Sequence, residues 1–286
     1  MHIGVHKTAT TYMQGLCELN QRKLNEAGVG FIPLTELRQS FTRHLMAFSP
    51  ESFNIETYLE RFFRGAQPST VRGLILSDEN FIGWGGTLIQ SGRAYAEAEK
   101  RLTRIRELLA GHRITMFMAI RSYDSFTASL YCETLRNTQR FVKFNEFRRK
   151  FDFASVRWPG MVRRFADALR PDAIRLWRYE DFRPLSDRIV RDLAFDVEVS
   201  EKAAKAETLE HPSFSQTSVD ILEMIADRFG ASVAGELINS VPKILRKGDR
   251  YPAYNPWDDE NRGTMANLYE EDYRSFPDDI WLVRPA

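Results

Sequence analysis

The sequence has little cysteine and no long apolar run. Its 286 residues contain two cysteines, Cys17 and Cys132, which lie too far apart for a disulfide framework or a cysteine metal site. A reducing compartment fits this usage, and residues 1–5 lack the profile of a signal peptide, so we expect a cytoplasmic protein. No apolar stretch approaches the roughly 18 to 20 residues that cross a bilayer, so no membrane span is expected.

The sequence also lacks a charge of one sign. It has 40 Lys and Arg residues against 39 Asp and Glu residues, a formal net charge of +1. Non-specific nucleic-acid binding depends on excess positive charge, so we expect no nucleic-acid partner. Only 9 of the 40 basic residues are lysine, and the arginine bias favours bidentate binding of phosphate, sulfate or carboxylate, although GC-rich codon usage gives the same bias.

What is present is an alternation of short apolar runs with longer amphipathic segments. This pattern predicts an α/β fold with a central parallel β-sheet flanked by helices. Strands are expected over 2–5, 29–32, 73–77, 113–120 and 173–177. Helices are expected over 10–27, 93–110, 122–138, 158–169, 184–193 and 258–275, with two or three more within 34–66 that a break at residues 49–50 divides. A glycine-rich turn is expected over 83–86. No linker or repeat stands out, so we expect one domain over 1–286, mainly helical from about residue 200.

The segment after the first expected strand carries a lysine and three hydroxyl groups at the start of a helix. The N-terminus of a helix has unpaired N–H donors and a partial positive charge, so these residues predict an anion site. Its predicted members are Lys7, Thr8, Ala9, Thr10 and Thr11. The competing interpretation is a simple strand-to-helix turn with a threonine N-cap.

The same segment differs from the P-loop of nucleoside triphosphatases. His6 stands where that motif requires its second glycine. No later strand ends in the paired acidic pattern expected to hold Mg²⁺, and the histidines show no metal-ligand spacing. We therefore expect no metal, and a cofactor whose transferred group is not a γ-phosphate.

Three motifs together resemble the sulfotransferases that use 3′-phosphoadenosine 5′-phosphosulfate. Residues 7–11, Lys-Thr-Ala-Thr-Thr, resemble the family's 5′-phosphosulfate loop, usually Lys-x-Gly-Thr-Thr. Arg121, followed eight residues later by Ser129 and then by Tyr131, is similar to the family's 3′-phosphate site, and residues 177–182 are similar to its Tyr-Glu-Asp-Leu segment. The resemblance extends over nearly the whole chain and is to small bacterial-type members. It implies an architecture like that of P-loop nucleoside triphosphate hydrolases and nucleotide kinases.

The resemblance implies in-line transfer of a sulfuryl group, without a metal, to a hydroxyl or amine of a small-molecule or glycan acceptor, leaving adenosine 3′,5′-bisphosphate. Lys7 would stabilise charge on the leaving oxygen, residues 8–11 would hold the 5′-phosphate, and Arg121 with Ser129 the 3′-phosphate. Ala9 departs from the family's glycine; a Cβ there costs of order 1 kcal/mol if the position needs a positive φ. Arg246 and Lys247 are similar to a basic segment that closes over the 3′-phosphate, although such a charge run also suits a solvated loop.

The acceptor must lose a proton, so a base is expected near the phosphosulfate. The expected strand 73–77 ends in Asp78-Glu79-Asn80, and we take Glu79 as the catalytic base. Asp78 and His6 are alternatives, and Asp78 also suits a helix N-cap. Two other functions stay open: a nucleotide kinase that uses this loop for ATP, and a non-catalytic nucleotide-binding protein.

Overall fold

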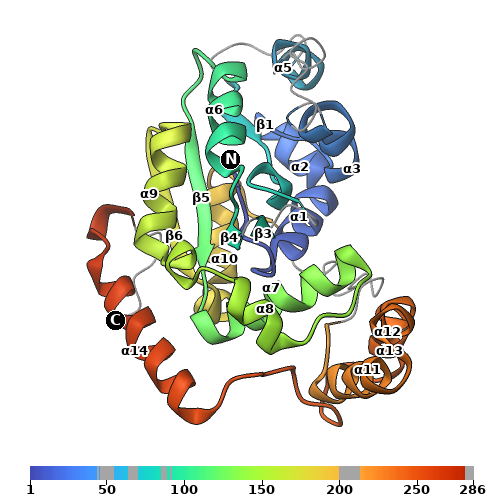
Figure 1. The fold of residues 1–286 in the computed structure, drawn as a ribbon. Helices are drawn as coiled ribbons and strands as arrows, with labels where there is room; N and C mark the ends of the chain where they lie inside the picture. The colour runs from blue at the N-terminus through green and yellow to red at the C-terminus, as the bar shows by residue number, and fades with distance from the viewer. Residues whose placement is uncertain are drawn as a thin grey trace.

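The computed structural model describes residues 1–43, 45, 55–63, 70–84, 89–90, 92–199 and 213–280. These residues form a mixed α/β fold in which parallel strands are flanked by helices (Figure 1). Strands β1 (Val29–Phe31) and β2 (Gly73–Ile75) form one parallel pair. Strands β5 (Thr115–Ile120) and β6 (Ala173–Arg178) form another. The predicted α/β class with parallel strands is thus present, but the sheet is small.

The first residues of the chain lie between the two strand pairs. His2 forms parallel bridges to Ser77 and to Phe117, and its backbone N–H donates to the Leu76 carbonyl at 2.8 Å. The order across the sheet is therefore β1, β2, the N-terminal segment (residues 1–5), β5 and β6. The strand expected over 2–5 was wrong in length, because Val5 turns its carbonyl to the Thr8 hydroxyl, at 2.5 Å, and not to a neighbouring strand.

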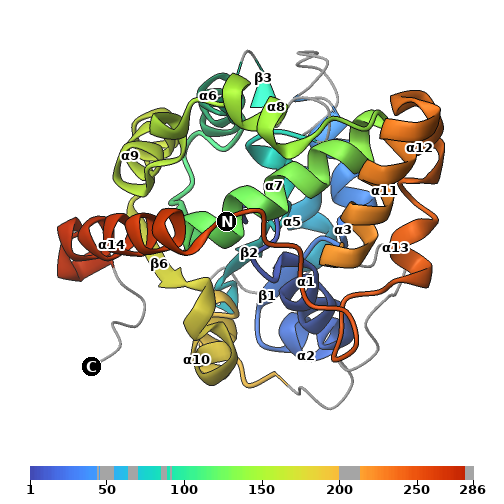
Figure 2. The same ribbon diagram turned by 60° about the horizontal axis from the view of Figure 1, so that its bottom comes forward.

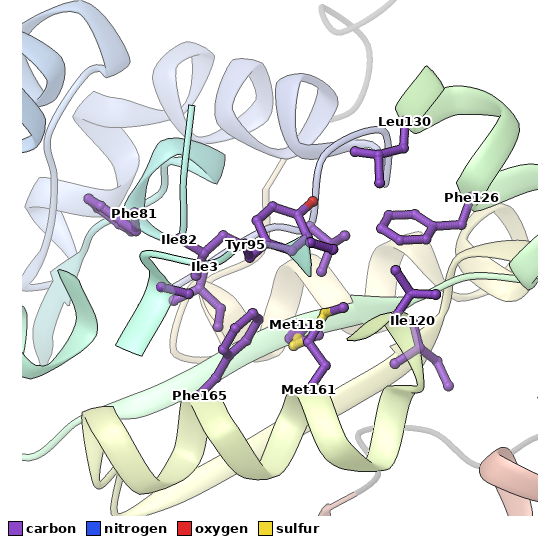
Figure 3. Packing of buried hydrophobic residues seen from close by; sticks show 14 of the residues in the cluster. Ile3, Phe81, Ile82, Tyr95, Met118, Ile120, Phe126, Leu130, Met161 and Phe165 are labelled. Atoms are coloured by element: carbon purple, nitrogen blue, oxygen red, sulfur yellow. The ribbon is translucent and has the colours of Figure 1, made fainter. Parts of the chain in front are cut away.

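Alternation along β5 divides the core into two layers, since successive strand residues face opposite sides of a sheet. Phe117 and Ala119 pack with the helices on one face. These are α1 (Thr10–Leu19), α2 (Gln21–Glu26) and α10 (Phe182–Leu193). On the other face Met118 and Ile120 pack against α9 (Trp158–Leu169) and α6 (Ala98–Leu108). Figure 3 shows these two residues opposite Met161 of α9.

Two expected helices differ from the structure. The helix expected over 10–27 divides at Asn20, whose side chain donates to the Leu16 carbonyl at 2.8 Å. The helix expected over 93–110 begins later, because Tyr95 has a φ of 51° and interrupts helical geometry. Residues Arg93–Ala94 before it form β4, which pairs antiparallel with β3 (Ile89–Gln90).

The described part of the expected helical stretch over 34–66 includes three helical pieces. They are α3 (Leu34–Leu37), the π-helical turn η1 (Arg38–Thr42) and α5 (Ile55–Phe63). The expected break at residues 49–50 lies outside the described residues, as do the last two glycines of the turn at 83–86. The shorter elements elsewhere are η3 (Glu79–Phe81), α8 (Phe144–Lys150), η5 (Phe153–Val156), η6 (Tyr179–Asp181) and η8 (Asp278–Ile280).

From residue 213 the described chain is largely helical. Its elements are α11 (Gln216–Phe229), α12 (Ala231–Leu237), α13 (Val241–Ile244) and α14 (Asp259–Ser275). Figure 2 shows α11 to α13 grouped together, away from α14. Helix α14 is fixed by Asp272, which accepts from Tyr123 of α7 (Tyr123–Thr138) and from Arg157 beside α9. In the part of the chain that is described, no helix is both long and apolar enough to cross a membrane.

Candidate anion site and its surroundings

Residues 6–11, called here the anion loop, connect the N-terminal segment to α1. Lys7 has a φ of 68° and Ala9 a φ of 64°, so two non-glycine residues adopt the left-handed conformation within one short turn. Left-handed residues in a turn direct successive backbone N–H groups into a concavity that suits anions. Ala9 thus has the conformation that glycine adopts at no cost.

The start of α1 leaves donors without partners. Ala9 occupies the N-cap position and has no side chain that could cap, and the first turn holds no acidic residue. The N–H of Met13 makes the first helical bond, to the Ala9 carbonyl. No partner of the Thr10 and Thr11 N–H groups is found among the described residues. The Thr10 hydroxyl, although buried, also has no partner there. An unpartnered buried hydroxyl beside open N–H groups fits an anionic ligand.

The other two hydroxyls of the loop differ from that of Thr10. Thr8 is fully buried and donates its hydroxyl to the Val5 carbonyl within the loop. Its side chain therefore shapes the turn, and only its N–H could serve a ligand. Thr11 is exposed at the start of α1.

Arg121 reaches the anion loop from the end of β5. Its Nη1 donates to the Lys7 carbonyl at 2.8 Å and its Nε to Ser125 Oγ at 2.9 Å. The guanidinium carbon lies 4.6 Å from the ring centroid of Tyr179. Burial lowers the pKa of Arg121, and the charge of Glu180 opposes that effect. The structure thus brings the predicted 3′-phosphate residue to the predicted 5′-phosphosulfate loop.

Ser129 lies on α7 one turn after Ser125 and one turn before Glu133. Residues four apart share a helix side, so Ser129 belongs to the side of α7 from which Ser125 contacts Arg121. Arg246 and Lys247, by contrast, are exposed on a turn after α13. They take no part in the hydrogen bonds that fix the Arg121 guanidinium, which go to Ser125 and to the Lys7 carbonyl.

Glu79, in η3, faces the first helix. Its Oε1 accepts from Arg38 Nη2 at 2.8 Å and its Oε2 from Gln14 Nε2 of α1 at 3.4 Å. The side chain keeps 20% of its surface exposed. A carboxylate oriented in this way and partly open to solvent could receive a proton from a bound acceptor.

Asp78 differs from its neighbour. It is fully buried, and its two oxygens accept from Arg38, from Thr42 Oγ1 at 2.8 Å and from the Asn80 N–H at 3.0 Å. Burial and the charge of Glu79 raise the pKa of Asp78, while Arg38 lowers it. Asp78 caps η3, and its occupied oxygens leave it poorly placed to reach a substrate.

His6 is buried beside Tyr95. Its ring stacks on Tyr95 with centroids 5.8 Å apart, and its backbone N–H donates to the Tyr95 hydroxyl oxygen at 3.3 Å. Burial lowers the pKa of His6, against the raising effect of Glu79 and Glu133. His6 is therefore a neutral side chain at pH 7.

The Lys7 ammonium makes an ion pair with Glu133 of α7. The distance from Lys7 Nζ to Glu133 Oε2 is 2.7 Å, and Arg136 Nη1 lies 3.0 Å from the same oxygen. Burial alone would raise the pKa of Glu133, but the two cations outweigh it and bring that pKa to about 2. The carboxylate is thus ionised at every ordinary pH.

Sequence reasoning missed several residues of this site. Glu133 could have been found, because it follows Ser129 by four residues on an expected helix and so shares its side. Ser125 could have been found in the same way, because it precedes Ser129 by four residues on that helix. Arg38 and Tyr95 carry no local pattern, since tertiary folding alone brings them to Glu79 and His6. Within the described ranges, no group of three or more His, Cys, Asp or Glu side chains could hold a metal ion.

No protein-family model and no curated protein matches the chain. Among solved structures the chain is similar to a sulfotransferase from Alicyclobacillus acidocaldarius, with 14% identity and a TM-score of 0.40. The likeness covers 86% of this chain and 95% of the other.

Proposed function

We propose that the protein is a sulfotransferase that binds 3′-phosphoadenosine 5′-phosphosulfate and transfers its sulfuryl group to a hydroxyl or amine acceptor. The observation that carries the proposal is a convergence on one turn: N–H donors and a buried Thr10 hydroxyl that have no partner among the described residues lie there with the guanidinium of Arg121. Anion donors on two separate segments suit a ligand that carries two phosphate groups, one for each segment.

The residues present fit such a cofactor, which supplies an activated sulfuryl group when bound. Thr10 and Thr11 would hold the 5′-phosphate with N–H groups and hydroxyls, and Thr8 and Ala9 with N–H groups. Arg121 would hold the 3′-phosphate together with Ser129. Its Nη1 and Nε are already bonded within the protein, which fixes the guanidinium plane. No hydrogen bond of its Nη2 is found among the described residues, so this atom is the donor offered to the ligand.

Two side chains would act on the reacting atoms. Lys7 would place its ammonium beside the oxygen on which charge develops, where a positioned cation lowers the barrier. Glu79 would accept the proton of the acceptor, held in orientation by Arg38 and Gln14. Arg246 and Lys247 would act only if their exposed turn closes over the cofactor. The acceptor belongs to the small molecules or glycans.

Binding and turnover together test the proposal. Adenosine 3′,5′-bisphosphate and ATP with Mg²⁺ are titrated separately, and sulfuryl transfer from 3′-phosphoadenosine 5′-phosphosulfate is followed over a panel of hydroxyl and amine acceptors. The proposal expects tight binding of the bisphosphate in EDTA, with turnover that EDTA leaves unchanged. Mg²⁺-dependent ATP binding and phosphoryl transfer would instead show a kinase. Binding without any turnover would show a non-catalytic nucleotide-binding protein.

A further inference from the structure

The proposed catalytic lysine is already engaged by a carboxylate inside the site. Lys7 Nζ lies 2.7 Å from Glu133 Oε2, and the Glu133 side chain is only 15% exposed. The cation expected to meet a bound anion therefore has a negatively charged partner within the protein. Glu133 belongs to neither the predicted phosphate residues nor the predicted base.

Glu133 is held in place by residues other than Lys7. Arg136 Nη1 lies 3.0 Å from its Oε2, and Asn137 Nδ2 donates to its Oε1 at 3.1 Å. Both partners are on α7, so the carboxylate is fixed on that helix and keeps a cation when Lys7 leaves. Lys7, by contrast, has a flexible side chain with 35% of its surface exposed, and can exchange partners.

We propose that Glu133 is a positioning residue that competes with the anionic ligand for the Lys7 ammonium. This inference rests on the proposed function. A phosphate or phosphosulfate group that reaches the anion loop draws Lys7 from Glu133, and the ion pair given up offsets part of the gain. The nucleotide product is consequently bound less tightly than the loop donors alone would allow, which speeds its release.

Removing the charge of Glu133 should therefore strengthen binding. In Glu133→Gln, Lys7 has no carboxylate to leave, and we expect the affinity for adenosine 3′,5′-bisphosphate to rise roughly 5- to 50-fold, mainly through slower dissociation. A merely structural role predicts the opposite sign, because loss of a buried ion pair would loosen α7 and weaken binding. Glu107→Gln is the matched control, since Glu107 also pairs with an arginine on its own helix, Arg104, but at the surface.

A double-mutant cycle shows whether Glu133 acts through Lys7. In a Lys7→Ala background, Glu133→Gln should tighten bisphosphate binding much less than in the wild-type background. Equal tightening in both backgrounds would mean simple repulsion between Glu133 and the ligand, and would overturn the competition. Glu133→Asp serves as a second variant if the glutamine protein does not fold: its shorter carboxylate should release Lys7 in part and tighten binding to a smaller extent.

Calorimetric titration with adenosine 3′,5′-bisphosphate distinguishes failure of the proposed function from failure of the proposed role of Glu133. If the wild-type protein does not bind the bisphosphate, the proposed function fails and this inference fails with it. If the wild-type protein binds and the folded Glu133→Gln protein binds equally or more weakly, the role of Glu133 alone is refuted. Tighter binding by Glu133→Gln, with Glu107→Gln unchanged, supports both.

Discussion

Arg121 and Lys7, 114 positions apart, are joined by a hydrogen bond of 2.8 Å from the guanidinium Nη1 to the backbone carbonyl. This bond fixes the anion loop to the end of β5, so that the guanidinium of Arg121 and the N–H groups of the loop lie at the same turn. Open α/β sheets bind ligands at the carboxyl ends of their strands, and both residues lie there. The loop conformation and the position of the arginine therefore depend on each other.

Replacing Lys7 should separate catalysis from binding. In Lys7→Ala we expect kcat to fall by roughly 10²-fold or more, with a smaller change in bisphosphate affinity, because the ammonium meets charge that develops only in the transition state. Lys23→Ala is the control, since Lys23 is an exposed lysine on α2. Steady-state kinetics with the phosphosulfate donor measure the effect, and wild-type kcat in Lys7→Ala would remove the lysine from the mechanism.

Replacing Glu79 tests the base. Glu79→Gln keeps the shape and the contact with Gln14 but cannot take a proton, so kcat should fall roughly 10²- to 10⁴-fold with cofactor affinity nearly unchanged. Glu18→Gln is the control: Glu18 is exposed on α1, and the substitution should leave kcat unchanged. If the Glu79→Gln protein retains its rate, the proton passes to another group, and His6 is then the first to test.

The left-handed conformation of Ala9 predicts a stabilising substitution. An L-residue at a φ of 64° is strained, whereas glycine adopts that region freely at the cost of a more flexible unfolded chain. Ala9→Gly should raise the free energy of unfolding by up to about 1 kcal/mol. Ala27→Gly is the control, because Ala27 has a φ of −89° and gains nothing from glycine. The free energies of unfolding are measured in urea. If Ala9→Gly lowers that free energy as much as Ala27→Gly does, the backbone at Ala9 is not strained.

His2 should make the fold sensitive to acid. Burial and the neighbouring N-terminal charge lower its pKa from 6.5 to about 3. As the pH falls below 6.5 the unfolded chain binds a proton that the folded chain does not, so this contribution to stability is lost progressively between pH 6.5 and about 3.

In His2→Phe the dependence of unfolding free energy on pH should be flatter over that range, by up to about 1.4 kcal/mol per pH unit. Urea midpoints between pH 5 and 7.5 measure the slopes. Parallel slopes for His2→Phe and the wild type would show that His2 is not the group responsible.

The sequence predicted those parts of the fold that depend on local pattern. The apolar run that forms β5 and the amphipathic segments of α7 and α9 were found nearly at their observed bounds. The strand expected from residue 2 was too long, because the turn of the chain at Val5 depends on a hydrogen bond to the Thr8 hydroxyl. The hairpin strand at residues 93–94 was missed because its partner strand, not its own pattern, decides it.

In the candidate site, too, the residues that carry a local motif were predicted, and those that only the tertiary fold brings together were not. Residues 7–11 and Arg121 carry motifs, and the structure places them together at one turn. Arg38 was unpredictable, since its contacts with Asp78 and Glu79 join segments about 40 residues apart and follow from packing alone. The ion pair of Lys7 with Glu133 likewise requires the relative placement of the loop and α7, which no periodicity encodes.

The most direct test of the proposed phosphosulfate site compares adenosine 3′,5′-bisphosphate with adenosine 5′-monophosphate by calorimetry, in EDTA, for the wild type and for Arg121→Ala. The two ligands differ only in the 3′-phosphate that Arg121 is proposed to hold. We expect the wild type to prefer the bisphosphate by roughly 30- to 1000-fold, as for a desolvated arginine-phosphate pair, and Arg121→Ala to lose that preference. Equal affinity of the wild type for the two nucleotides, or an unchanged preference in Arg121→Ala, would contradict it.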